Sequence, residues 1–122
     1  MTWRWPRIGV VVDCADPRRM SEFWSAVLGL DEIDAQGPYR VLASPDGREP
    51  RVLLQQVDEP RGGKNRLHLD VHVNDLAAEL ARVEALGAVR IDREPIEEFG
   101  SRWVRFCDPE GNEFCVVDVG RH

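Results

Sequence analysis

The amino-acid sequence predicts an α+β protein built from two similar βαβββ modules in one domain. Two observations give the repeat: a strand, an aspartate cap, a helix and a Leu-Gly pair occur twice in that order, and a turn followed by a strand also occurs twice. A chain of 122 residues is long enough for one compact domain. We therefore expect a single domain over residues 1–122, with module 1 at about 1–60 and module 2 at about 65–122.

The first module begins with an apolar run at residues 8–12, which predicts a strand. Asp16 is a good helix cap, and Pro17 suits the first helical position. Gly29 is expected to end the helix. Apolar side chains recur at helical spacing between these signals, at Met20, Phe23, Trp24, Val27 and Leu28. The turn sequence at residues 44–47 then leads to a predicted strand at 52–57.

The second module repeats this order. Residues 67–73 alternate between apolar and polar side chains and lead to Asn74-Asp75, which predicts a strand followed by a helix cap. Helical spacing continues to Gly87 through Leu76, Leu80, Val83 and Leu86. The turn at residues 108–111 precedes a predicted strand at 113–119. Each half is predicted to contain a strand, one helix and then about three further strands. A single helix cannot cover both faces of such a sheet, so we expect the two halves to form one domain together.

Composition excludes several classes of partner. Sixteen basic against 22 acidic residues give a net charge of -6, which argues against nucleic acid and anionic membrane surfaces. No apolar run approaches the roughly 20 residues of a membrane span, and the N-terminal segment lacks the pattern of a signal peptide. The three cysteines include no CxxC pair, which argues against a disulfide framework or structural zinc. We expect a cytoplasmic protein.

Residues 66–72 carry the sharpest indication of a binding surface. Leu67, Leu69, Val71 and Val73 should face the helix layer, because side chains alternate along a strand. The opposite face then carries four polar side chains, at Arg66, His68, Asp70 and His72. An ordinary solvated face is the alternative interpretation. Two of the three histidines on one stripe favour a functional pocket.

The same alternation selects further residues for this pocket. The predicted substrate-binding residues are Asp13, Lys64, Arg66, His72, Trp103, Arg105 and Cys115. Arg66 would hold an anionic group by a bidentate contact, with Lys64 nearby. Trp103 would give a flat apolar wall for a ring. In the alternative interpretation Arg66 pairs with Asp70 and Trp103 belongs to the core.

His68 and Asp70 are the candidate catalytic residues. They lie on the same predicted face, where the carboxylate would bias the imidazole toward proton transfer. The residues leave open whether the chain is an enzyme at all, and His68 could equally line the pocket without a chemical role.

Three segments carry a resemblance to a known group of proteins. GVVVDCADPRRMSEFWSAVLGL and DPEGNEFCVVD resemble the vicinal oxygen chelate (VOC) superfamily, the glyoxalase/bleomycin-resistance/dioxygenase group. NRLHLDVHVND is similar to the start of that group's second module. The resemblance covers nearly the whole chain and is greatest with small glyoxalase-like domain proteins. It implies a curved mixed sheet around a central cavity, helices outside, and a homodimer.

The resemblance also raises the question of a metal. Enzymes of the superfamily commonly place one ligand on the first and one on the last strand of each module. Alignment of the two capping aspartates puts Gly9 and His68 at the first-strand positions and Cys115 at the last position of module 2. The remaining position falls near Gln55 or Gln56. Because glycine offers no donor and cysteine replaces a carboxylate, we expect no cofactor, although a divalent metal at His68 with Gln55 or Gln56 remains open.

Three functions are compatible with this resemblance, since one fold hosts many chemistries. We expect a protein that binds a small anionic or aromatic metabolite in the cavity between the modules, without the full metal site. One alternative is a metal-dependent lyase, isomerase or dioxygenase. The other is a non-catalytic antibiotic-sequestering or protein-interaction module. An enzyme of the lyase or isomerase type would use His68 and Asp70 in proton transfer.

Overall fold

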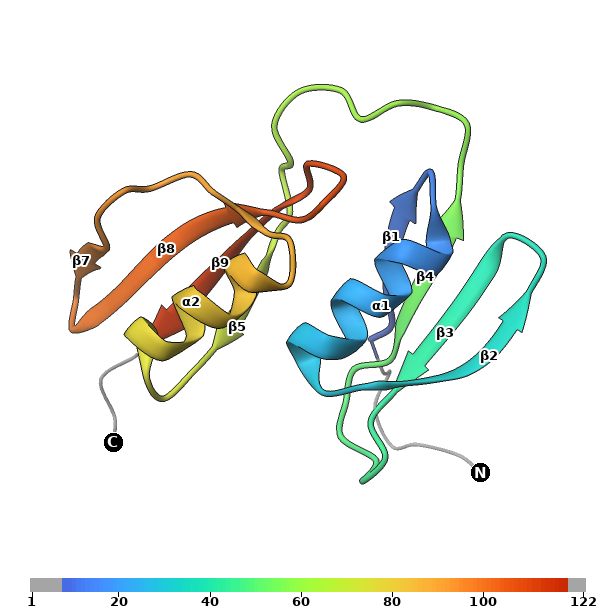
Figure 1. The fold of residues 1–122 in the computed structure, drawn as a ribbon, viewed down its shortest axis with the longest axis horizontal. Helices are drawn as coiled ribbons and strands as arrows, with labels where there is room; N and C mark the ends of the chain where they lie inside the picture. The colour runs from blue at the N-terminus through green and yellow to red at the C-terminus, as the bar shows by residue number, and fades with distance from the viewer. Residues whose placement is uncertain (1–7, 119–122) are drawn as a thin grey trace. The chain divides into compact units, whose positions relative to one another are not determined.

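The computed structural model describes residues 8–118, which divide into two compact units between Pro60 and Arg61 (Figure 1). Each unit contains one helix packed on a mixed sheet. The predicted fold class is therefore confirmed: the chain is α+β, with two βαβββ-like modules. None of the helices in the described part is long and apolar enough to cross a membrane.

The first unit has a four-stranded sheet. Its elements in chain order are β1 (Val10–Cys14), α1 (Pro17–Leu28), β2 (Asp31–Gln36), β3 (Tyr39–Ala43) and β4 (Val52–Gln56). The strand order is β1-β4-β3-β2, with β1 parallel to β4 and the other pairs antiparallel. The helical crossover between β1 and the rest of the sheet is what allows the parallel pair.

Local sequence signals explain α1. The Asp16 side chain accepts a hydrogen bond from the Arg19 backbone N at 3.1 Å, and Pro17 stands at the helix start. Gly29 ends the helix with a φ of 67°, a left-handed conformation that glycine adopts without strain. The buried face of the helix meets one face of the sheet, and the fully buried side chains are Met20, Trp24, Leu42, Val52 and Leu54.

The second unit has a five-stranded sheet. Its elements are β5 (Leu69–His72), α2 (Leu76–Ala85), β6 (Val89–Arg90), β7 (Ile96–Glu98), β8 (Ser101–Cys107) and β9 (Glu113–Asp118). The order is β5-β9-β8-β6, and β7 also pairs with β8. Where the first unit has the single strand β2 paired with β3, the second unit has two short strands, β6 and β7, that both pair with β8. Pro95 lies between them, and it has no N–H for a sheet hydrogen bond.

The second core confirms the predicted faces of β8 and β9. Val104, Phe106, Phe114 and Val116 are at most 1% exposed and lie on the α2 side, and the two phenylalanine rings stack at 5.7 Å. The expectation for Leu67 was wrong, since β5 begins only at Leu69 and Leu67 is 89% exposed. Val119, the last residue of the predicted final strand, lies outside the described residues.

Candidate functional site

The strand pairing shows which positions of the two units correspond. Counted back from the capping aspartates of the two helices, Val11 of β1 and Asp70 of β5 hold the same position. Val11 pairs with Leu53 of β4, and Asp70 pairs with Cys115 of β9. Leu53 and Cys115 therefore correspond. Both lie on the sheet face that points away from the helix of their own unit.

Three side chains with metal-ligand or proton-transfer chemistry meet on this face of the second sheet. His68 precedes β5, Asp70 lies in β5, and Cys115 lies in β9. The His68 Nε2 is 3.2 Å from the Asp70 Oδ1, and one ligand-type atom from each of the three residues lies within 4.8 Å of the others. His68 and Asp70 are about half-exposed, whereas Cys115 is buried. The two candidate catalytic residues are thus in contact.

Burial determines the state of Cys115. It raises the pKa of the thiol to about 11, and the negative charge of Asp70 and a hydrogen bond to its carboxylate act in the same direction. At neutral pH the side chain is therefore a protonated thiol, which is a poor nucleophile. The thiol donates a hydrogen bond to the Asp70 carboxylate, which His68 also contacts.

Arg105 lies beside Cys115, and its guanidinium group forms an ion pair with Asp92. Arg105 and Cys115 are register partners on β8 and β9. The Arg105 Nη2 and Nε lie 2.8 and 3.0 Å from the Asp92 carboxylate oxygens, and its backbone N donates to the same carboxylate at 2.9 Å. The Arg105 hydrogen bonds hold the pKa of Asp92 below its usual range. Asp92 was absent from the predicted site, because it lies in the loop before β7 and no periodic pattern points to it.

The predicted Lys64 and Arg66 lie in the exposed segment before β5. Lys64 Nζ is 2.6 Å from the Glu113 Oε2, and Arg61 lies 3.8 Å from the other oxygen of that carboxylate. This pairing lowers the pKa of Glu113 and ties the segment to the start of β9. Arg66 is not on the strand, so alternation does not assign its side chain to a face.

His72 and Trp103 share the face of the cluster. Both are register partners of Val117, His72 from β5 and Trp103 from β8. His72 is exposed and Trp103 is half-buried. The second sheet thus presents four of the predicted binding residues on the same face as Asp70: His72, Trp103, Arg105 and Cys115.

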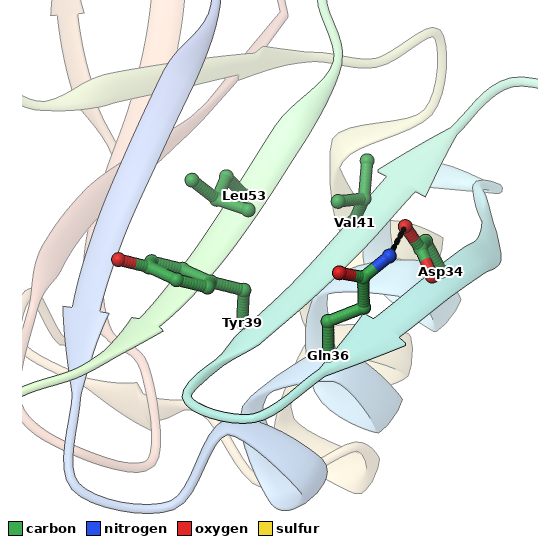
Figure 2. Close-up of a pocket in the computed structure, with 5 residues that line it drawn as sticks. All are labelled: Asp34, Gln36, Tyr39, Val41 and Leu53. Carbon is green, nitrogen blue, oxygen red and sulfur yellow. Dashed lines mark hydrogen bonds between the residues drawn. The ribbon is translucent and has the colours of Figure 1, made fainter.

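The corresponding face of the first sheet has a different character. It carries an apolar hollow of about 290 Å³. Figure 2 shows the residues that line the hollow, which are Asp34, Gln36, Tyr39, Val41 and Leu53. The Gln36 Nε2 donates to the Asp34 Oδ2 at 3.0 Å along its β2 rim. None of these residues was among the predicted site residues. The alternation of Tyr39, Val41 and Ala43 in β3 was the signal that could have found them.

Asp13, the single predicted binding residue of the first unit, is exposed and pairs with Gln55. Gln55 also pairs with Tyr39. Because Gln55 corresponds to Val117, Tyr39 holds the same position in the first sheet that Trp103 holds in the second. Each sheet therefore carries one aromatic side chain at an equivalent place on its open face.

The glyoxalase-like domain profile matches residues 9–117, which is nearly the whole described chain. The chain belongs to the glyoxalase-like domain family. Solved structures of the wider superfamily have the same fold. A glyoxalase/bleomycin resistance protein/dioxygenase family enzyme from Burkholderia phytofirmans PsJN matches with a TM-score of 0.78 at 20% identity, over 91% of this chain and 96% of that one.

Two further glyoxalase-like structures agree. A glyoxalase/bleomycin resistance protein from Albidiferax ferrireducens T118 has a TM-score of 0.68 at 20% identity and covers 90% of this chain and 95% of its own. A superfamily member from Sphaerobacter thermophilus DSM 20745 has a TM-score of 0.71 at 18% identity and covers 93% and 97%. At such identities the likeness establishes the fold alone. No curated protein matches the sequence.

The donor set does not fit the metal arrangement that the superfamily resemblance implies. The strand pairing puts Leu53, and neither Gln55 nor Gln56, at the position that corresponds to Cys115. With Gly9 at the position that corresponds to His68, the first module offers no donor side chain at either place. A metal shared between ligands of both modules therefore has no support from these residues.

Proposed function

We propose that this glyoxalase-like chain binds a small organic molecule through the open faces of its two sheets, with apolar contact from module 1 and polar contact from module 2. One observation carries the proposal. Corresponding rows of the two open sheet faces differ in chemistry: the row in module 1 is Val11, Leu53 and Val41, and the row in module 2 is Asp70, Cys115 and Arg105.

The hollow at Tyr39 and Leu53 supports the apolar half of this recognition. Small-molecule sites are mostly apolar and concave, with a few polar groups that orient the ligand. Here the polar groups are the Asp34 carboxylate and the Gln36 amide on one rim of the hollow (Figure 2). An aromatic ring in the hollow would gain apolar contact and ring stacking.

The second sheet supports the polar half. His68, Asp70 and His72 are exposed on or next to one face, together with the paired Arg105. These groups can donate and accept hydrogen bonds, and a protonated histidine can attract an anion. The ligand class that matches both halves is an aromatic or otherwise apolar metabolite with one hydrogen-bonding or anionic substituent.

A thermal-shift screen with aromatic carboxylates, phenols and aliphatic acids of the same size tests this proposal. We expect aromatic members to stabilise the protein. For the best ligand, Tyr39→Ala and Trp103→Ala should each weaken binding on the order of tenfold, which corresponds to roughly 1.4 kcal/mol per ring. Ile33→Ala is the matched control, because Ile33 is a 52% exposed apolar side chain of β2 that does not line the hollow. Unchanged binding in both aromatic variants would refute the proposal.

Proton transfer is a second candidate function. The observation in its favour is the 3.2 Å contact between the His68 Nε2 and the Asp70 Oδ1, which orients the imidazole on an exposed face. A lyase or isomerase of this kind would lose turnover in His68→Asn while keeping ligand affinity. Retention of turnover in that variant would exclude this role.

A homodimer is also part of the proposal. Small sheets leave strand edges to protect, and symmetric pairing of chains is a common solution. Light scattering should then give twice the chain mass of 13.9 kDa, and a value near 13.9 kDa would contradict it. The cytoplasmic location remains a prediction from the cysteine pattern.

A further inference from the structure

The open face of the first sheet combines acidic and amide side chains with apolar ones. Strand pairing and alternation place these side chains in two adjacent rows across the sheet. One row contains Asp34, Val41, Leu53 and Val11, and the other contains Gln36, Tyr39, Gln55 and Asp13. The two carboxylates stand at opposite edges of the sheet, and no lysine, arginine or histidine occupies any of these eight positions. This face should therefore attract a cation and repel an anion.

The nearby basic side chains lie outside the two rows. Arg40 of β3 is 3.2 Å from the Glu32 carboxylate, and Ser21 of α1 donates to the same carboxylate at 2.7 Å, so this ion pair lies on the helix side of the sheet. Arg51 precedes β4 and does not line the hollow. The charge beside the hollow is thus that of Asp34.

Hydrogen bonding fixes the amide of Gln36 with its oxygen toward the hollow. A carboxylate only accepts hydrogen bonds, so the Gln36 Nε2 must face Asp34, to which it donates at 3.0 Å. The Gln36 Oε1 then points toward Tyr39, as Figure 2 shows. The Asp34 carboxylate also accepts from the Ala35 backbone N at 2.9 Å and keeps further lone pairs for a ligand. The rim of the hollow thus offers acceptors to a ligand that brings donors.

We propose that this hollow binds a protonated amine of the ligand together with the apolar group that carries it. The inference rests on the proposed function and adds the charge of the group that the first module recognises. Asp34 and the Gln36 Oε1 would accept the ammonium hydrogens, and the face of the Tyr39 ring would attract the positive charge. Val41 and Leu53 would contact the carbon atoms of the ligand.

The size of the hollow limits what it can hold. Its volume of about 290 Å³ is at the lower end of the roughly 300–1,000 Å³ typical of small-molecule sites. One ring or short aliphatic chain with its amine fits such a space. The polar groups of the second sheet are not needed for this contact, so the inference depends on the first module alone.

The test compares three compounds with the same aromatic body: phenethylamine, phenethyl alcohol and hydrocinnamate. Each is titrated into the ¹⁵N-labelled full chain at pH 7, and the Kd is fitted from the amide shifts of Tyr39, Val41 and Leu53. We expect phenethylamine to bind at least about fivefold more tightly than hydrocinnamate, with the alcohol between them. The order follows from charge, because the apolar contact is nearly the same for all three.

Two variants of exposed residues on β2 identify the source of the preference. Asp34→Asn removes the charge, and Gln36→Leu removes the acceptor while keeping apolar bulk. Each should weaken phenethylamine binding about threefold without weakening hydrocinnamate binding. Asp31→Asn is the matched control, because it removes the same charge from the same strand at an exposed position that does not line the hollow. It should keep the wild-type affinity for the amine.

The outcomes separate this inference from the broader one. Equal affinity for phenethylamine and hydrocinnamate, or full amine affinity in both Asp34→Asn and Gln36→Leu, would overturn the amine site and leave the binding of an organic ligand intact. Failure of phenethylamine to bind the wild-type chain would also overturn it. The broader proposal is decided by Tyr39→Ala and Trp103→Ala with the best ligand of the thermal-shift screen.

Discussion

Asp70 and Cys115 lie directly opposite each other on the parallel strands β5 and β9, and the carboxylate of the first helps to keep the thiol of the second protonated. The corresponding pair in the first module is Val11 and Leu53. The same place in the repeated fold is thus polar in one module and apolar in the other. We therefore expect the second sheet to provide polar groups for a ligand and the first sheet to provide apolar contact.

Asp70→Asn should lower the pKa of Cys115 from its value of about 11, because it removes a negative charge next to the thiol. Burial is the larger cause and remains, so the pKa should stay above that of a free cysteine. The measurement is thiolate absorbance against pH in the presence of a chelator, with the Cys115→Ser signal subtracted. Asp31→Asn, an exposed change in the first unit, is the control. An unaltered Cys115 titration in Asp70→Asn would disprove the coupling.

Asp92→Asn should destabilise the protein by about 1–2 kcal/mol at pH 7, since Asp92 accepts charge-assisted hydrogen bonds from Arg105 and Arg105 is partly exposed. The pKa of Asp92 is lowered in the folded state. Its stabilisation is therefore present above the unfolded pKa, near 4, and is lost as the pH falls through the folded pKa.

Urea unfolding of both proteins at pH 7 and in acid measures this effect. The stability gap between wild type and Asp92→Asn should shrink in acid. Glu97→Gln, which breaks an exposed pair with Arg102 at 3.3 Å, should change stability by less than about 0.5 kcal/mol. A gap for Asp92→Asn that is constant with pH would show that the Asp92–Arg105 pair is not its source.

Asp108→Ala should cost about 2–3 kcal/mol of unfolding free energy. The buried Asp108 carboxylate accepts hydrogen bonds from the backbone N of Glu110 and of Asn112, both at 2.9 Å. The alanine variant would remove this acceptor from both backbone N–H groups. In the matching turn of the first module Asp46 is exposed and bonds to Ser44. Asp46→Ala should therefore cost less. Equal losses in chemical denaturation would contradict this assignment.

Alternation along the strands was the part of the sequence that predicted structure best. It assigned Val104 and Phe106 to the core and Trp103 and Arg105 to the other face, because a buried layer on one side fixes which way a strand points. It failed at Leu67, where the chain has not yet joined the sheet. A repeat pattern alone does not show where pairing begins.

The sequence alone could not predict contacts between segments that lie far apart along the chain. The segment 48–51 differs in length from its counterpart, so only the pairing of β1 with β4 could show that Leu53 corresponds to Cys115. Asp92 comes from an irregular loop, and its contact with Arg105 depends on how that loop folds over β8. Cys115 was predicted to line the same pocket, but its approach to Asp70 required the β5–β9 register.

The most direct test of ligand binding at the open sheet faces is a ¹H–¹⁵N NMR titration of the full chain with the best aromatic ligand from the thermal-shift screen. We expect the chemical-shift changes to concentrate on both open sheet faces, at Tyr39–Val41 and Leu53 in the first module and at Trp103–Arg105 in the second. Perturbations restricted to α1 and α2, or to one module alone, would contradict ligand binding at the two sheet faces.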